Sequence, residues 1–339
     1  MTVSRILHRL GIDPYLIALI ATVALAAILP ASGGGAFVLD YVVVGAVALL
    51  FFLYGAKLST EAVVGGLTHW RLQVLVLVAT FVLFPLLGLA LTAVFKSWIT
   101  ADLALGLMFL CVLPSTVQSS IAFTSIARGN VPAALCSASV SNLVGMVLTP
   151  ALVGLLLTTH GGGFDLKSLE KIALQLLLPF VAGQVLRPWV GPWIAHHKSL
   201  IGFVDRGSIL LVVYSAFSEG VVAGIWGKVG IESLILILAL DSLLLAIVLV
   251  ATTVVSRRLG FSKEDEITIV FCGSKKSLAS GVPMANILFA GRSLGMIVLP
   301  IMLFHQIQLF VCATMAQKYA ARPAAHPAHG KAVKAAASA

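Results

Sequence analysis

Residues 111–120 read CVLPSTVQSS and residues 272–283 read CGSKKSLASGVP, and both stretches stand inside apolar runs long enough to cross a membrane. Proline, glycine and small hydroxyl residues interrupt helices. Backbone groups freed by an interruption cannot face lipid without partners, so such segments face protein or a water-filled cavity. The two stretches therefore predict a pair of broken spans, which is typical of a transporter binding site. The alternative is that Pro114 and Pro283 only kink ordinary helices.

The composition of the whole chain indicates a membrane protein. Of its 339 residues, 60% are hydrophobic and 10% are charged, which leaves too little polar surface for a soluble globule. A span needs about 20 apolar residues, and this rule predicts ten spans. They cover approximately residues 15–31, 37–56, 72–95, 103–127, 131–158, 172–190, 207–226, 233–256, 267–290 and 294–317.

The distribution of charge predicts the orientation of these spans. If the N-terminus is cytoplasmic, the inner side holds 15 lysines and arginines and the outer side holds 5. The positive-inside rule then places both termini in the cytoplasm. The same rule accounts for the net charge of +9, and since no basic helix face or aromatic platform accompanies it, no nucleic-acid partner is expected.

Ten spans with both ends on one side divide into two sets of five, and the second set must enter the membrane from the opposite side. We therefore predict an all-α polytopic fold with an inverted repeat. The predicted parts are a cytoplasmic N-terminal segment (1–14), a first five-helix repeat (15–158), a second, inverted repeat (165–318) and a disordered cytoplasmic tail (319–339).

Lys275 and Lys276 are the most unusual residues of the second interruption, because a lysine at the centre of a span costs roughly 2.5 to 3.5 kcal/mol on insertion scales. Glu219 and Asp241 are the candidate counter-charges. One hypothesis is that the lysines capture an anion, or that one titrates in place of a bound cation. The other is a structural Lys–Asp pair with the second lysine snorkelling.

Polar residues near the two interruptions are the candidate binding residues, because N-terminal ends of half-helices suit anions and freed carbonyls suit cations. The candidate substrate- or ion-binding residues are Ser115, Thr116, Gln118, Ser119, Ser120, Ser137, Ser141, Asn142, Lys275, Lys276, Ser277, Ser280, His305 and Gln308. Small residues such as Ser137 also serve close helix packing. His305 either relays protons or is satisfied by a neighbour. We find no cluster with metal-ligand spacing and no serine with a paired base, so no enzymatic activity is predicted.

Several local motifs resemble a known family. They are Gly11-Ile12-Asp13-Pro14, Leu53-Tyr54-Gly55, His69-Trp70-Arg71, Phe84-Pro85-Leu86-Leu87-Gly88, Leu113 to Ser120, Ala127-Arg128-Gly129-Asn130-Val131, Tyr214 to Glu219, and Gly273 to Leu278. The chain resembles bile acid:sodium symporter-like proteins, specifically a bacterial branch similar to the divergent seventh member of the vertebrate bile-acid carrier group. The likeness extends to about Lys318.

This resemblance implies an architecture and a location. Spans 3–5 and 8–10 would form a core, spans 1, 2, 6 and 7 would form a panel, and the broken spans 4 and 9 would cross. The protein would lie in a bacterial inner membrane and move a small organic anion by alternating access. Its oligomeric state is left open.

The resemblance also implies a sodium site near the crossing, where Ser119 and Ser120 stand at the family's span-4 positions, with Asn replaced by Ser. Span 9 departs from that pattern, because the expected Glu falls on Phe271, the expected Gln on Lys275 and the following Asn on Lys276. Two cations in place of an acid should repel sodium. We therefore expect a sodium- or proton-coupled transporter, or a uniporter, in which a lysine takes the place of a cation. The alternatives are an ion carrier without organic substrate, and a membrane regulator or scaffold of ion homeostasis.

Overall fold

The computed structural model describes residues 14–57, 69–157, 166–222, 224, 230–290 and 292–322. The predicted N-terminal segment up to residue 13 and the tail beyond Arg322 lie outside these residues. All regular elements in the described ranges are helical. They are α2 (Pro14–Ile28), α3 (Gly34–Lys57), α5 (Trp70–Val78), the π-helix η1 (Ala79–Leu83), α6 (Phe84–Val94), α7 (Ala101–Val112), α8 (Gln118–Ile126), α9 (Val131–Leu157), α10 (Leu166–His196), α11 (Lys198–Val222), α12 (Ile231–Arg258), α13 (Lys263–Gly273), α14 (Leu278–Leu288) and α15 (Leu294–Ala320).

Length and hydropathy identify a multi-pass membrane protein. Six helices of the described chain are long and apolar enough to cross a membrane, when α5, η1 and α6 are counted as one. They are α3, Trp70–Val94, α9, α11, α12 and α15, and two shorter apolar helices cover Ile17–Ile28 and Ala101–Val112.

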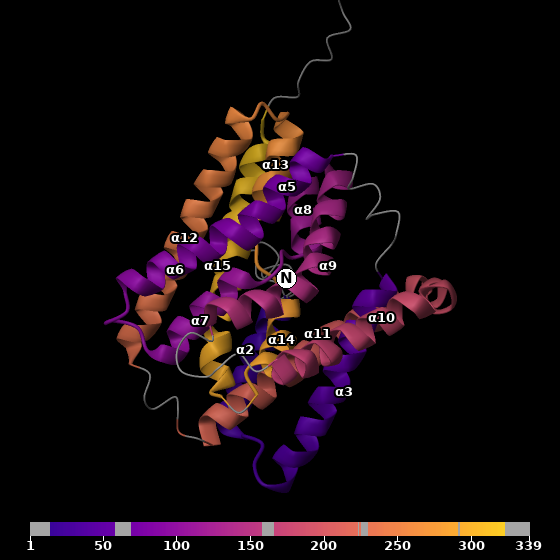
Figure 1. Ribbon diagram of the computed structural model, residues 1–339, viewed down its shortest axis with the longest axis vertical. Coiled ribbons are helices and arrows are strands. Elements are labelled where there is room, and N and C mark those ends of the chain that lie inside the picture. Colours follow the sequence, from indigo (N-terminus) through magenta and orange to yellow (C-terminus); the bar gives the residue numbers. More distant parts are fainter. Residues whose placement is uncertain are drawn as a thin grey trace, which may run out of the picture.

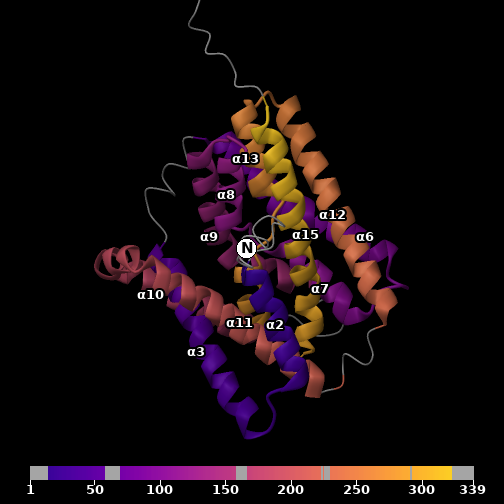
Figure 2. The same ribbon diagram turned by 180° about the vertical axis from the view of Figure 1, so that it is seen from behind.

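The helices form two groups in space. In Figure 1, α3, α10 and α11 lie together in the lower part of the molecule, and α5, α8, α9, α12, α13 and α15 lie together above them. The view from behind shows the same grouping (Figure 2). Segments far apart in the sequence, such as α5 and α13, are neighbours within the upper group (Figure 1).

Two glycines allow α3 and α10 to cross in close contact. A Cβ added to Gly55 on α3 would lie 2.0 Å from the carbonyl oxygen of Phe180, and one added to Gly183 on α10 would lie 2.0 Å from that of Phe52. Both distances are far below van der Waals contact. Small residues at such crossings are the usual means by which membrane helices approach closely.

Both predicted interruptions are present. The first separates α7, which ends at Val112, from α8, which begins at Gln118. The second separates α13, which ends at Gly273, from α14, and the hydroxyl of Ser277 caps α14 by accepting a hydrogen bond from the Ser280 N–H.

One breaker of the second stretch does not lie at the break. Pro283 is inside α14. Proline has no N–H to donate to the carbonyl four residues earlier, which here is that of Ala279. The hydroxyl of Tyr54 on α3 donates to this carbonyl instead, at 3.3 Å. Pro283 therefore exposes an acceptor to a neighbouring helix without ending its own.

The predicted tail begins too early. α15 continues to Ala320, and the guanidinium of Arg322 donates to the carbonyls of Ala127 (3.1 Å) and Arg128 (2.8 Å) and to Glu264 (3.0 Å). These bonds satisfy carbonyls at the end of α8 and join it to the segment that follows α15.

The glycine crossing generates a stability prediction. Gly55→Ala should lower the free energy of unfolding by about 1 to 3 kcal/mol, because the added methyl group overpacks the α3–α10 contact. Thermal unfolding of the purified protein in detergent measures the effect. Gly45→Ala on the same helix is the control, because nothing lies within 4 Å of a Cβ there. Equal melting temperatures for the two variants would contradict the close crossing.

Candidate functional site

A cavity with both polar and apolar lining lies beside the two breaks and is bounded on its other side by α3, α10 and α11. Its volume is about 560 Å³. The break regions contribute Thr116, Gln118, Ser119, Ser277 and Ser280 to its lining, and the helices that follow them contribute Asn142 and His305. We call this space the central cavity.

The first break leaves a run of carbonyl groups that receive no hydrogen bond from the backbone of their own helix. The hydroxyl of Thr149 donates to Val112 O (2.8 Å), the N–H of Ser277 donates to Pro114 O (2.9 Å), and the side-chain amide of Asn142 donates to Ser115 O (2.8 Å). The first break is therefore satisfied by α9 and by the second break.

The second break is satisfied in a corresponding way. Gln308 on α15 accepts from the backbone N–H of Lys276 (2.9 Å) and donates to its carbonyl (2.9 Å). The hydroxyls of Ser115 and Ser120 donate to Cys272 O (2.6 Å) and Phe271 O (3.2 Å). Each break thus supplies hydrogen bonds to the other, and the pair forms one hydrogen-bonded unit.

The Lys276 ammonium is fully buried and donates to three backbone carbonyls. They belong to Thr80 (2.8 Å), Cys111 (2.8 Å) and Leu113 (2.7 Å). A lysine ammonium has three donors, and here all three are used. The ring of Phe84 lies 4.1 Å from the nitrogen. Two of the acceptors are carbonyls at the C-terminal end of α7, where the helix dipole favours a positive charge.

The third acceptor depends on the π-helix, which the sequence analysis did not predict. In η1 a backbone N–H bonds five residues back, as Phe84 N–H does to Ala79 O. The residue five positions after Thr80 is Pro85, which has no N–H. The Thr80 carbonyl is therefore left without a backbone donor, and Lys276 supplies one.

Lys275 points to the other half of the first broken helix. Its ammonium donates to the carbonyl of Ser119 in the first turn of α8 at 2.9 Å and lies 3.9 Å from the ring centroid of Phe123. The hydroxyls of Thr116 and Ser119 hydrogen-bond to each other at 2.7 Å, and the Thr116 hydroxyl also contacts that of Ser120 at 3.1 Å.

The predicted counter-charges do not pair with the lysines. None of the ion pairs formed among the described residues joins Lys275 or Lys276 to an acid. Glu219 lies beside Asp40 in the lining of a separate cavity of about 510 Å³. Asp241 is buried in α12 and its carboxylate has no hydrogen-bond partner in the described part of the chain. Backbone carbonyls solvate the lysines instead, a role that sequence does not reveal.

The remaining candidates divide by position. Ser141 accepts a hydrogen bond from the Ser115 N–H at 3.0 Å and does not line the cavity. Ser280 donates to the Asn142 side chain at 2.9 Å, which links α14 to α9. Gln308 donates to His305 Nδ1 at 2.9 Å, and His305 reaches the cavity. Ser137 is buried, and its hydroxyl has no hydrogen-bond partner among the described residues.

Sequence reasoning missed the opposite wall of the cavity. Tyr54 and Lys57 of α3, Phe180 of α10, and Asp205 and Arg206 of α11 line it. Lys57 and Asp205 form an ion pair. The sequence holds no local pattern that would bring Lys57 near the broken helices.

A helical membrane protein in which two broken helices meet beside a cavity has the features of a secondary transporter. The chain belongs to the SBF-like CPA transporter family, whose model matches residues 13–321. The family consists of transporters and not of enzymes. This finding confirms the resemblance drawn from the motifs.

Similar proteins match over nearly the whole chain. An uncharacterised protein of Pseudomonas aeruginosa is 60% identical over 311 residues, covering 91% of this chain and 93% of the relative. The Escherichia coli K12 protein named "Putative symporter YfeH" is 54% identical over 312 residues, covering 91% and 93%. Sodium/bile acid cotransporter 7 of Rattus norvegicus is 29% identical over 321 residues, covering 91% and 92%.

The different bonding of the two lysines generates a second prediction. Lys276→Met should destabilise the protein more than Lys275→Met, because it removes three hydrogen bonds to buried carbonyls instead of one, at about 1 to 3 kcal/mol for each carbonyl left unsatisfied. Thermal unfolding of both variants in one detergent makes the comparison. A Lys276→Met protein as stable as the wild type would show that these three hydrogen bonds are not needed.

Proposed function

We propose that this protein is a secondary transporter that moves a small organic anion across the inner membrane of a bacterium by alternating access. Its ten spans form two inverted repeats, residues 15–158 and 165–318, and both termini are cytoplasmic. Spans 1, 2, 6 and 7 form a panel against which a core of spans 3–5 and 8–10 moves. The names of two relatives, a symporter and a sodium/bile acid cotransporter, favour solute transport.

The paired hydrogen bonding of the breaks supports the inverted repeat. In each half, the long helix that follows the broken span supplies the polar side chains that satisfy the break: Ser141 and Asn142 of α9 bond to Ser115, and Gln308 of α15 bonds to Lys276. Two halves built on one plan would produce this correspondence.

The observation that carries the anion proposal is the arrangement of donors around the central cavity. The first turns of α8 and α14 both contribute to its lining, α8 through Gln118 and Ser119 and α14 through Leu278 and Ala279. N-terminal turns expose N–H groups with partial positive charge, which suit an anion. Lys57 and Arg206 line the opposite wall. Apolar residues such as Phe180 and Leu278 complete the cavity, which suits the organic part of a solute.

The residues near Ser119 and Ser120 do not fit a sodium ion. Lys275 already places an ammonium 2.9 Å from the Ser119 carbonyl, and a second cation beside it would be repelled. The Ser120 hydroxyl is directed to Phe271 O. We therefore propose that the lysine ammonium occupies the place that a coupling cation would take, and that coupling, where present, is to protons.

Transport by the purified protein tests this proposal. Proteoliposomes are challenged with a panel of organic anions, from short carboxylates to bile acids, and charge movement or uptake is recorded. Lys275→Gln should abolish nearly all flux, because it removes the buried cation beside α8. Lys318→Gln is the control, because Lys318 is exposed at the end of α15.

The outcome that would contradict the proposal is flux that persists in folded Lys275→Gln protein and rises with sodium. If the protein binds an anion but transports none in any gradient, the result would instead favour a regulator that keeps the transporter fold. Size-exclusion profiles and melting curves separate loss of flux from loss of folding.

A further inference from the structure

A second cavity adjoins the central cavity and has a different character. Its volume is about 920 Å³. It shares Lys57, Gln118, Gly202 and Asp205 with the central cavity. The rest of its lining comes from Ala56 of α3, the C-terminal half of α10 and the first turns of α11. We call it the basic cavity.

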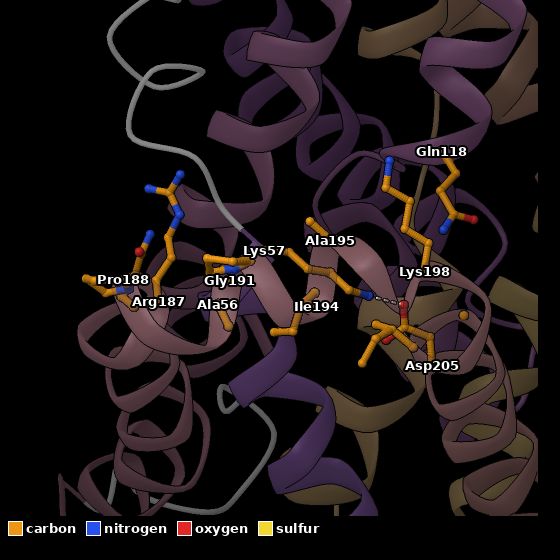
Figure 3. Close-up of a pocket in the computed structure, with 14 residues that line it drawn as sticks. Ala56, Lys57, Gln118, Arg187, Pro188, Gly191, Ile194, Ala195, Lys198 and Asp205 are labelled. Atoms are coloured by element: carbon orange, nitrogen blue, oxygen red, sulfur yellow. Dashed lines mark hydrogen bonds and ion pairs between the residues drawn. The ribbon is translucent and has the colours of Figure 1, made fainter.

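The lining of the basic cavity is positively charged. Lys57, Arg187 and Lys198 contribute positive charges, whereas Asp205 is the one acidic residue in the lining, so the described lining carries a net charge of +2. Asp205 forms an ion pair with Lys57. In Figure 3, Arg187 lies to the left of this pair and Lys198 lies above it. An anionic group between them would be attracted from both sides.

The walls between these charges are apolar. Pro188, Pro192, Ile194 and Ile201 line the same cavity. Such walls do not contribute to the binding of a small inorganic anion, because its binding free energy comes only from polar contacts. A ligand that carries a phosphate on an apolar body would use both parts of the lining.

Two tryptophans place the basic cavity at the surface of the bilayer. Trp189 and Trp193 of α10 are 72% and 48% exposed and alternate along the helix with the cavity-lining residues. Exposed tryptophans of membrane helices concentrate at the level of the lipid headgroups. The cationic groups of Arg187 and Lys198 therefore lie near the depth at which lipid phosphates lie.

We propose that the basic cavity binds the headgroup of an anionic phospholipid, with its phosphate between Arg187 and Lys198. Basic pockets between membrane helices are a recognised means of holding such headgroups. Because the cavity shares residues with the central cavity, a bound lipid lies next to the transport site and restricts access to it. This proposal stands apart from the transport proposal, because it concerns lipid binding and not flux.

Native mass spectrometry of the delipidated full-length protein tests the proposal. Phosphatidylglycerol, phosphatidylethanolamine and inorganic phosphate are added separately, and then phosphate is added in competition with phosphatidylglycerol. We expect phosphatidylglycerol to bind more tightly than phosphatidylethanolamine and to resist displacement by millimolar phosphate. In the double variant Arg187→Gln/Lys198→Gln its affinity should fall about thirtyfold, at about 1 kcal/mol for each basic residue.

Lys318→Gln is the matched control, because this exposed lysine does not line the cavity, and its lipid affinity should equal that of the wild type. If the double variant does not fold, Lys198→Gln alone should still weaken phosphatidylglycerol binding several-fold. Equal binding of the two lipids, or unchanged binding in the folded variants, would overturn the proposal. Displacement of the lipid by phosphate would overturn it in favour of a site for a soluble anion.

Discussion

The structure depends on a constraint of the membrane interior: carbonyl and amide groups freed by a helix break find no water there and must bond to protein. Two breaks lie side by side in this molecule, and Lys276 resolves the constraint by donating to three carbonyls, two at the C-terminal end of α7 and one in the π-helix. Its charge is thereby solvated by backbone dipoles. A buried lysine and buried carbonyls without donors would each destabilise the fold, and their hydrogen bonds to each other remove both costs.

Two parts of the molecule are held together in different ways, one by hydrogen bonds and the other by backbone packing. The breaks bond to each other and to α9 and α15, whereas α3 and α10 are held together by close backbone contact at Gly55 and Gly183. The central cavity lies between these two assemblies, and Tyr54 reaches across through a bond to Ala279 O of 3.3 Å.

The sequence revealed the features that have a local signature. Proline and glycine in the middle of apolar runs located both breaks, and two lysines in a span indicated an unusual site. The partners of the lysines were predicted wrongly, because sequence analysis looked for acids, whereas the structure uses carbonyls that every residue carries. The Thr80 carbonyl is available only because η1 shifts the hydrogen-bond register and Pro85 lacks an N–H. The second cavity wall, with Lys57 and Asp205, arises from packing between distant helices and has no local pattern.

The central claim is that an ammonium, and not a sodium ion, joins the broken helices. The most direct measurement is the melting temperature of the purified wild-type protein titrated with sodium chloride, against potassium and choline chloride at equal ionic strength. A resident ion that binds only the folded state raises the melting temperature as its concentration rises. Our account predicts the same curve for all three salts. A specific, saturable stabilisation by sodium would contradict it and would mean that a cation site persists beside Ser119 and Ser120.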